Sequence, residues 1–254
     1  AVIFRFHHYR YSLLSMAKPL SLEKILFSQG FGTRRYCSDL VYAELVKVNG
    51  VLAEDPDERI PTENLQLEVD GESWEFHEKA YVAFHKPVGY ECSHKTSHHP
   101  SIYGLLPQPL VERGIQCVGR LDHDTTGLIL MSDDGQFIHR MSSPKKHVPK
   151  VYQVTTKHPV DEKQISSLLA GVVLDDDPKP VKAAACEQTA SHRLDLTLTE
   201  GKYHQVKRML AAVGNRVEGL HRSQIGALVL PADLPPGAWK WLSQEDLSLL
   251  AQSS

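Results

Sequence analysis

The 254-residue sequence has no long hydrophobic run and only four cysteines. No apolar stretch approaches the ~20 residues that a membrane-spanning helix needs, which argues against a helical membrane protein. Cys37, Cys92, Cys117 and Cys186 are widely separated, and no pair has the spacing of a metal site or a redox motif. We therefore expect reduced thiols in a cytoplasmic protein.

An excess of positive charge is also missing, because 31 Asp and Glu outnumber 28 Lys and Arg and give a net charge of −3. Proteins that bind nucleic acids are often basic, so the total argues mildly against such a partner. The charge is uneven, however. Residues 1–76 carry 8 basic and 12 acidic residues, whereas residues 200–222 carry five basic and two acidic. Local patches matter more than the total for contact with phosphates.

The first nineteen residues are rich in aromatic residues, histidine and arginine. They lack the apolar stretch and the small-residue cleavage site of a secretory signal. We expect residues 1–19 to form a disordered extension without a function of its own.

Residues 20–76 have the pattern of a small separate unit. Apolar residues at helical spacing precede Gly30, a residue that commonly ends a helix, and Thr33 can cap a second helix that reaches residue 45. An Asn-Gly pair predicts a hairpin over residues 46–51, and a further strand is expected at residues 65–69. The acidic, polar residues 70–78 are the best candidate for a linker.

The rest of the chain, residues 77–254, alternates apolar strand patterns with helical patterns. Strands are predicted at 81–85, 117–119, 127–131, 151–155, 194–198 and 227–230, and helices at 134–140, 161–170, 203–213 and 243–251. The helices do not follow the strands one for one. This order favours an α+β fold over a doubly wound parallel sheet.

A charged, glycine-punctuated loop lies between two apolar strands in residues 118–130. Functional groups often lie on such loops because the flanking strands hold them rigid. Taken alone, Asp122 or Asp124 is more often a turn residue that bonds the backbone. The run from Asp122 to Thr126 also fits the Asp-x-Asp-x-Thr pattern of aspartyl-phosphate phosphatases. That interpretation needs an apolar strand right up to the first aspartate, and Gly119-Arg120 interrupts it.

Two further stretches are candidates for chemistry. Residues 199–210 open a helix directly after a strand, and the buried stripe of this helix leaves Lys207 and Arg208 on or beside the opposite face. Residues 150–152, Lys-Val-Tyr, place Tyr152 in a strand after a basic run. A solvated basic helix and a core tyrosine are the simpler interpretations of these two patterns.

Together the three stretches resemble the pseudouridine synthases, most closely the ribosomal small-subunit type. The resemblance spans roughly residues 80–245. The matching blocks are His-Lys-Pro-Val-Gly-Tyr-Glu-Cys-Ser at 85–93, Gly-Arg-Leu-Asp at 119–122, Lys-Val-Tyr at 150–152, residues 200–215, and His-Arg at 221–222. Residues 20–60 are similar to the S4 RNA-binding module in Arg34-Arg35 and in Val-Asn-Gly at 48–50. The resemblance implies an S4-like α/β module at 20–76, joined to a catalytic domain at 77–254 with a mixed, mainly antiparallel sheet flanked by helices.

The resemblance also implies the roles of the site residues. Asp122 is the catalytic aspartate, and it either attacks C1′ of the uridine or starts a glycal route by taking a proton from C2′. Lys207 is the best candidate for the cation that keeps Asp122 charged, with Arg208 as the second choice. Tyr152 stacks on the target base. The isomerisation is redox-neutral, so we expect no cofactor and no metal.

The remaining candidates are contacts to RNA. Arg120 is expected to hold the flipped nucleotide or to fill its place in the RNA. Further contacts are predicted at Arg34, Arg35, Lys47, Lys86, His139, Arg140, Lys145, Lys146, Lys202, His204, Gln205, Arg208 and Arg222. His94, His98 and His99 are expected to lie on a surface loop near RNA rather than to bind a metal.

The predicted function is therefore isomerisation of a uridine in ribosomal RNA, most closely 16S, to pseudouridine. The expected partner is ribosomal RNA within a pre-ribosomal particle of the small subunit, and we expect a monomer with no membrane partner. Two alternatives stay open: a large-subunit (23S) synthase, and a non-catalytic RNA-binding or ribosome-assembly protein that has kept the fold.

Overall fold

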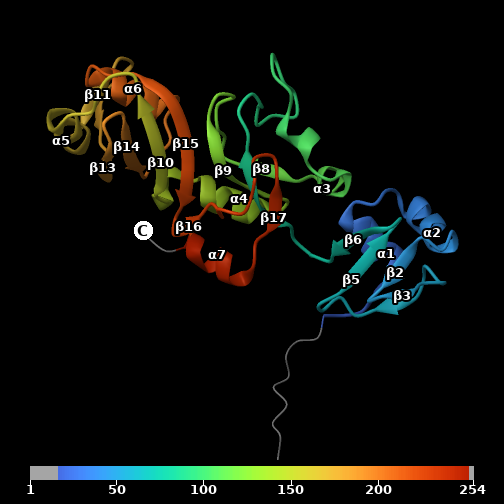
Figure 1. Cartoon of the computed structure of the whole chain (residues 1–254). Helices are drawn as coiled ribbons and strands as arrows, with labels where there is room; N and C mark the ends of the chain where they lie inside the picture. Colours follow the sequence, from blue (N-terminus) through green and yellow to red (C-terminus); the bar gives the residue numbers. More distant parts are fainter. Residues whose placement is uncertain (1–16, 252–254) are drawn as a thin grey trace, which may run out of the picture. The chain divides into compact units, whose positions relative to one another are not determined.

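A computed structural model describes residues 17–251 of the chain (Figure 1). The extension expected at residues 1–19 therefore lies largely outside the described residues. The chain divides into two compact units, Ala1–Glu78 and Lys79–Ser254, and each is described by itself. No helix within the described part is both long and apolar enough to cross a membrane.

The smaller unit contains two helices and a four-stranded antiparallel sheet in the order β3-β2-β5-β6. The bounds are β1 (Leu20–Ser21), α1 (Leu22–Gln29), α2 (Arg34–Tyr42), β2 (Val46–Val48), β3 (Val51–Leu52), β4 (Arg59–Ile60), β5 (Gln66–Val69) and β6 (Glu72–Glu75). Gly30 ends α1 with φ 92°, a left-handed conformation that glycine adopts without strain. The side chain of Thr33 accepts a hydrogen bond from the Tyr36 amide and caps α2. Both predicted helix signals are confirmed.

The linker predicted at residues 70–78 is wrong for most of its length. Asp70 and Gly71 have φ values of 50° and 83°, which makes them the tight turn of a hairpin. The chain then returns along β5 as β6, and Trp74 on this strand is buried. Acidic residues on the exposed face of β6 gave the stretch its polar, linker-like composition.

The larger unit is built on one nine-stranded sheet in the order β13-β14-β10-β15-β9-β7-β17, with β16 paired to β15 and β8 paired to β9. The strands are β7 (Tyr81–Lys86), β8 (Gln116–Val118), β9 (Thr126–Ser132), β10 (Lys150–Thr156), β13 (Ala185–Ala190), β14 (Arg193–Leu198), β15 (Val217–Ile225), β16 (Leu228–Val229) and β17 (Trp239–Trp241). The pair β9–β15 is parallel and the other pairs are antiparallel. The predicted α+β class with a mixed, mainly antiparallel sheet is confirmed.

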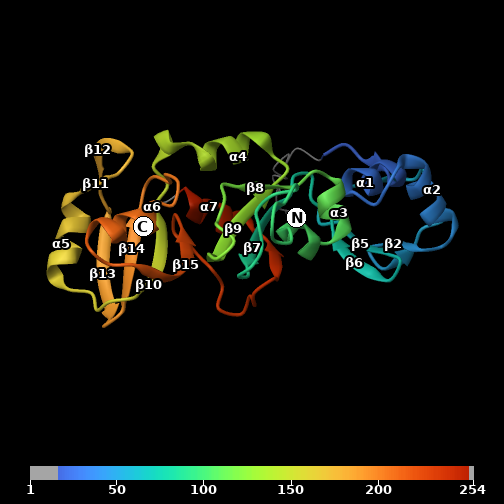
Figure 2. The same cartoon turned by 90° about the horizontal axis from the view of Figure 1, so that it is seen from above.

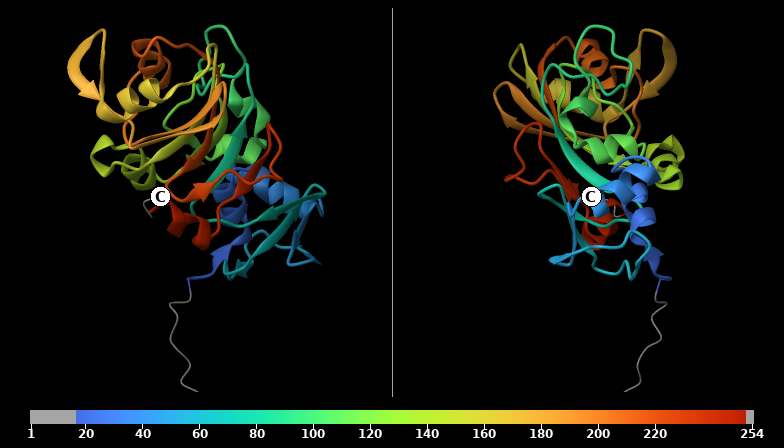
Figure 3. Two further views of the ribbon diagram at one scale, coloured as in Figure 1. Left: turned by 60° about the vertical axis from the view of Figure 1, so that its left-hand side comes forward. Right: turned by 90° about the vertical axis from the view of Figure 1, so that its right-hand side faces the viewer.

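Helices cover this sheet. They are α3 (Gln108–Glu112), α4 (Gly135–Ser142), α5 (Glu162–Ala170), α6 (Gln205–Ala212) and α7 (Gln244–Leu250), with 3₁₀ turns at Ile102–Leu105 and Pro144–Lys146. Figure 2 shows α4 along one side of β8 and β9, where Phe137 and Met141 of α4 join the core. The hairpin of β11 (Val172–Leu174) and β12 (Asp177–Val181) stands out from the rest of the unit in Figure 3.

Strand β15 crosses the middle of the sheet and was not predicted. Its parallel contact with β9 pairs Arg222 with Gly127. A side chain at Gly127 is excluded, because an added Cβ would lie 2.2 Å from the carbonyl oxygen of Arg222 and because φ is +117°. Glycine therefore lets the strand that follows the Asp122 loop approach β15 closely.

Candidate active site

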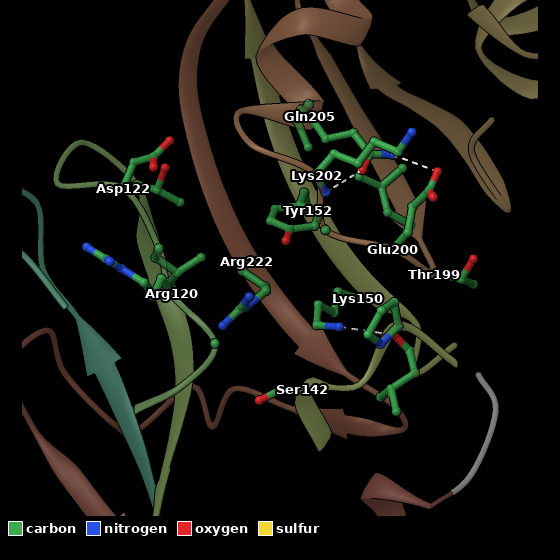
Figure 4. Close-up of a pocket in the computed structure, with 18 of the residues that line it drawn as sticks. Arg120, Asp122, Ser142, Lys150, Tyr152, Thr199, Glu200, Lys202, Gln205 and Arg222 are labelled. Atoms are coloured by element: carbon green, nitrogen blue, oxygen red, sulfur yellow. Dashed lines mark hydrogen bonds between the residues drawn. The ribbon is translucent and has the colours of Figure 1, made fainter. Parts of the chain in front are cut away.

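A pocket of about 290 Å³ opens between the loop that follows β8, strands β10 and β15, and the turn that begins α6 (Figure 4). Asp122 and Arg120 line it from the loop, and Tyr152, Lys150 and Arg222 line it from the sheet. The pocket thus brings together all three segments in which the sequence predicted chemistry.

A buried lysine fixes the loop that carries Asp122. The ammonium of Lys86 donates hydrogen bonds to the carbonyl oxygens of Pro87, His123 and Thr125 at 3.0, 3.2 and 2.8 Å. Burial lowers the pKa of Lys86, while nearby acidic groups act in the opposite direction. Lys86 is 0 % exposed, so its predicted contact with RNA is wrong. Its role is internal, because it ties both sides of the loop to the end of β7.

Asp122 lies against two basic side chains of the opposite segment. Its Oδ2 atom is 3.2 Å from Lys207 Nζ and 3.2 Å from His204 Nε2. Lys207 Nζ also contacts both carboxylate oxygens of Asp124, at 2.9 and 3.1 Å. One lysine therefore bridges the two aspartates of the loop.

The pKa directions agree with this bridge. Partial burial raises the pKa of Asp124, but the hydrogen bond and charge of Lys207 outweigh it and hold the pKa below its ordinary value. Burial likewise lowers the pKa of Lys207, and its bonds to Asp124 and Asp122 reverse that effect and raise it. Asp124 and Lys207 are therefore both charged at neutral pH.

Arg208, the second candidate for the cation, points elsewhere. Its guanidinium forms an ion pair with Asp176 and donates to the carbonyl oxygen of Tyr203 at 3.0 Å. Successive helix residues are rotated by roughly 100°, so only one of the two adjacent cations can face Asp122. In this structure that residue is Lys207.

The turn before α6 is held by its own side chains. His204 begins the helix in a left-handed conformation with φ 47°, which directs its ring toward Asp122. The Gln205 side chain accepts a hydrogen bond from the Lys202 amide at 2.8 Å and donates to Glu200 at 3.3 Å. Gln205 is only 4 % exposed but lines the pocket, so its contact with RNA stays a prediction. Lys202 forms an ion pair with Asp177, whose hydrogen bond raises the pKa of Lys202.

Three residues of the sheet share the face that forms the pocket. Tyr152 lies directly opposite Arg222 across the antiparallel pair β10–β15, and Lys150 precedes Tyr152 by two residues on the same strand. Arg222 is 3 % exposed. Its Nε donates to the carbonyl oxygen of Leu128 at 2.9 Å, whereas Nη2 has no hydrogen-bond partner within residues 17–251.

Lys150 was not predicted as a site residue. Its spacing of two from Tyr152 was the signal that could have found it, because alternate strand residues share a face. Figure 4 shows Arg222 between Arg120 and Lys150, with the ring of Tyr152 above it in that view.

The other predicted RNA contacts lie away from the pocket lining. In the smaller unit Arg34 pairs with Glu23 at 2.7 Å, Lys47 pairs with Glu68 at 3.3 Å, and Arg35 is exposed. In the larger unit the end of α4 and the following turn expose His139, Arg140, Lys145 and Lys146, next to residues 142–144 of the pocket. RNA contact at these positions stays a prediction.

The histidines of residues 94–99 are engaged in local contacts. His94 stacks on Tyr103 with ring centroids 3.6 Å apart, and His99 stacks on His123 at 4.1 Å. The backbone amide of His98 donates to Glu91 at 3.2 Å. Within residues 17–251 no group of three or more His, Cys, Asp or Glu side chains could hold a metal ion.

Asp122, the two basic side chains beside it and Tyr152 of strand β10 therefore face one pocket of about 290 Å³, which is close to the lower limit of ~300 Å³ for ligand sites. Such a carboxylate can attack an electrophilic carbon or remove a proton from a single bound residue of a larger substrate.

Comparisons with known proteins agree with this chemistry. Residues 80–212 match the family model described as RNA pseudouridylate synthase. The ribosomal small subunit pseudouridine synthase A of Haemophilus influenzae is 37% identical over 234 residues, which cover 92% of this chain and 100% of that protein. The protein of the same name from Escherichia coli K12 is 43% identical over 172 residues, which cover 68% of this chain and 74% of that protein.

A solved structure described as a pseudouridylate synthase has 37% sequence identity and a TM-score of 0.65, and the match covers 91% of this chain and 99% of that one. The resemblance of the sequence motifs is thereby confirmed, and the phosphatase alternative falls away. The chain belongs to the RNA pseudouridylate synthase family.

Proposed function

We propose that the protein isomerises one uridine of 16S ribosomal RNA to pseudouridine in the pocket around Asp122. The observation that carries this proposal is the position of Asp122 Oδ2, 3.2 Å from both Lys207 Nζ and His204 Nε2 and in the same pocket as Tyr152. The names of the curated relatives favour the small subunit over the large-subunit alternative.

The reaction breaks the bond between N1 and C1′, turns the uracil and joins C5 to C1′. The proton that leaves C5 is balanced by one taken up at N1, so no oxidant, reductant or activated donor is consumed. We propose no cofactor. Asp122 attacks C1′ or removes the proton from C2′, and both routes require its carboxylate to be ionised. Lys207 supplies the positive charge that keeps it ionised as substrate displaces water.

The target base must leave the RNA stack to reach Asp122, and this extrusion costs a few kcal/mol. The buried ring of Tyr152 offers a stacking surface for the flipped uracil. Arg120 is exposed on the same loop as Asp122, where its guanidinium can hold the flipped nucleotide or fill the space that it leaves.

The smaller unit is proposed to be an S4-like RNA-binding module. Its exposed basic residues include Arg34, Arg35 and Lys47. We propose further that the protein acts as a monomer in the cytoplasm, on ribosomal RNA within a pre-ribosomal particle of the small subunit. A salt titration of RNA affinity with and without residues 1–78 measures how many phosphate contacts this module adds.

The activity test is tritium release from RNA labelled at C5 of uracil. Asp122→Asn should abolish release while RNA binding survives, because the substitution removes the charge and keeps the size. Asp124→Asn is the matched control: it removes the other carboxylate on Lys207 and should reduce release far less. If Asp122→Asn keeps the wild-type rate, the assignment of Asp122 is wrong.

The target is identified by mapping pseudouridines in ribosomal RNA from a deletion strain, by carbodiimide modification and primer extension. Loss of one site in 16S RNA supports the proposal. Loss of a site in 23S RNA instead would make the large-subunit alternative correct. If the wild-type protein binds ribosomal RNA but releases no tritium from it, the protein uses its fold for binding alone.

A further inference from the structure

Lys150 and Arg222 form a pair of cations inside the pocket, and beyond the RNA contact predicted for Arg222 neither has been given a role. Both line the pocket with Asp122 and Tyr152, and the charge of Arg222 is close enough to lower the pKa of Lys150. No carboxylate within residues 17–251 forms an ion pair with either one. Two adjacent cations without a carboxylate are the chemistry of a site for an anion or for electron-rich oxygen atoms.

Their remaining contacts leave donor groups available. Lys150 Nζ donates one long hydrogen bond, 3.3 Å to the carbonyl oxygen of Val148. Arg222 is held at Nε by Leu128, and its buried Nη2 has no partner in the part of the chain that the structure describes. A buried, unsatisfied guanidinium nitrogen costs free energy, so such a group in a pocket indicates a bound partner that satisfies it.

The strand geometry places these donors next to the ring on which the base is proposed to stack. Lys150 and Tyr152 are two residues apart on β10, and Arg222 is the cross-strand neighbour of Tyr152. The β10–β15 register shifts between Val151 and Tyr152, which places a bulge in the pairing immediately beside Arg222. Bulges of this kind are frequent next to active sites because they redirect a side chain.

The burial of Arg222 indicates that the base, and not a phosphate, contacts the pair of cations. A flipped nucleotide enters base first, and its phosphates stay with the RNA backbone at the mouth of the pocket. Arg120, exposed on the loop, is placed for a phosphate, whereas Arg222 is 3 % exposed and is placed for the inner edge of the base. Uracil presents two carbonyl oxygens on its edge, and both accept hydrogen bonds.

We propose that Lys150 and Arg222 bind the carbonyl oxygens of the target uracil and stabilise the uracil anion that forms when the N1–C1′ bond breaks. This inference rests on the proposed function. The electron pair of the broken bond stays on N1 and is shared with the two carbonyl oxygens, so negative charge develops where the two cations lie. No proton is transferred to the base at this step. When C5 bonds to C1′, the electron pair of the anion forms the new bond and the negative charge returns to the carboxylate of Asp122.

The pair also selects uracil. Cytosine carries an amino group in place of one carbonyl oxygen, and that group would direct its hydrogens at a cation. Hydrogen-bond donors that uracil satisfies and cytosine leaves unpaired let the enzyme discriminate between the two bases.

The test compares two substrates in single-turnover reactions and measures loss of the N1-linked nucleoside by chromatography and mass spectrometry of the digested RNA, because a 5-fluorinated base has no C5 proton to release. One RNA carries uridine at the target position and the other carries 5-fluorouridine, whose base bears negative charge more easily because fluorine withdraws electrons. Lys150→Met should slow conversion of uridine by about 10²-fold, the effect of removing one donor from a preorganised anion site. With 5-fluorouridine the loss should be several-fold smaller.

Lys150→Arg, which keeps the charge, should restore part of the rate. Lys157→Met is the matched control, since this exposed lysine follows the same strand outside the pocket. Arg222→Lys keeps a positive charge near the carbonyl oxygen of Leu128. It should also slow conversion of uridine more than conversion of 5-fluorouridine. A purely structural role for Lys150 predicts equal losses with both substrates, and that result would overturn the inference.

A phosphate contact is the other outcome to exclude. It predicts that Lys150→Met weakens RNA binding and reduces the slope of log Kd against log salt by ~0.7, with an unchanged rate on bound RNA. That result would also overturn the inference. If Asp122→Asn is inactive but Lys150→Met turns over like the wild type, the inference is refuted and the proposed function stands. If the wild-type protein itself shows no turnover, the proposed function is refuted.

Discussion

A largely buried cation should destabilise the folded protein, and Lys150 allows this cost to be measured. The pKa of Lys150 falls from 10.5 to about 8, chiefly because burial disfavours the ammonium and also because of the charge of Arg222. At roughly 1.4 kcal/mol for each pH unit, this difference corresponds to about 3 kcal/mol that opposes folding at pH 7. Partial exposure of the side chain reduces that value, so we expect Lys150→Met to raise the free energy of unfolding by about 1–2 kcal/mol.

The sign follows from proton binding. Between pH 8 and 10.5 the unfolded chain holds a proton on Lys150 that the folded protein has released, so wild-type stability rises with pH in this interval. The advantage of Lys150→Met is therefore complete below about pH 8 and disappears as the pH rises through the interval. Methionine keeps most of the side-chain volume, so the cavity term stays small.

Urea unfolding at pH 7 and near pH 10 measures the effect. Trp239 and Trp241 report on the larger unit when Trp74 of the smaller unit is replaced by Phe in both proteins. Lys86→Met is the internal comparison: this lysine is also buried, but three short hydrogen bonds compensate its charge. The reasoning fails if Lys150→Met is less stable than the wild type at pH 7, or if its advantage does not shrink at higher pH.

Three further outcomes are expected. Lys207→Met should lower the rate of tritium release by about 10²-fold because it removes the charge-assisted bond to Asp122, whereas Arg208→Met should stay within a few-fold of the wild type. Gly127→Ala should lower the melting temperature and the unfolding free energy by more than ~3 kcal/mol, since its Cβ meets the carbonyl oxygen of Arg222 at a φ that already strains alanine. Lys86→Met should cost about 2–4 kcal/mol in urea unfolding, because it removes a donor from three carbonyl oxygens, of which that of His123 keeps the Gly89 amide. If Lys207→Met, Gly127→Ala or Lys86→Met behaves like the wild type in its assay, the contact from which its effect was predicted does not have the proposed importance.

Local signals in the sequence predicted most of the elements. Gly30 and Thr33 act through bonds to residues within one helical turn, and the Asn-Gly turn fixes its hairpin by backbone conformation alone. Such elements depend on neighbours in the sequence. The four helices predicted in the larger unit were found for the same reason, because one face of each is apolar.

Strand β15 shows why the remainder could not be predicted. Its residues do not alternate between apolar and polar, since it lies in the middle of the sheet and lines a polar pocket on one face. Its charged residue Arg222 is buried because its neighbours in the sheet, β9 and β10, lie on either side of it and Leu128 of β9 accepts a hydrogen bond from its Nε. The same limit explains Lys86, which looks like a surface lysine in the sequence and is buried by contacts with a loop 37 residues away.

The active site combines groups from two separate parts of the chain, the loop that carries Asp122 and the strands β10 and β15. Asp122 follows β8 and precedes β9, whereas the groups proposed to hold the base come from β10 and β15. The parallel contact of Gly127 with Arg222 joins these two halves, and the bond from Arg222 to Leu128 repeats the link through a side chain. Arg222 therefore connects the backbone that positions the carboxylate with the surface that would bind the departing base. Any movement of β15 would therefore change both at once.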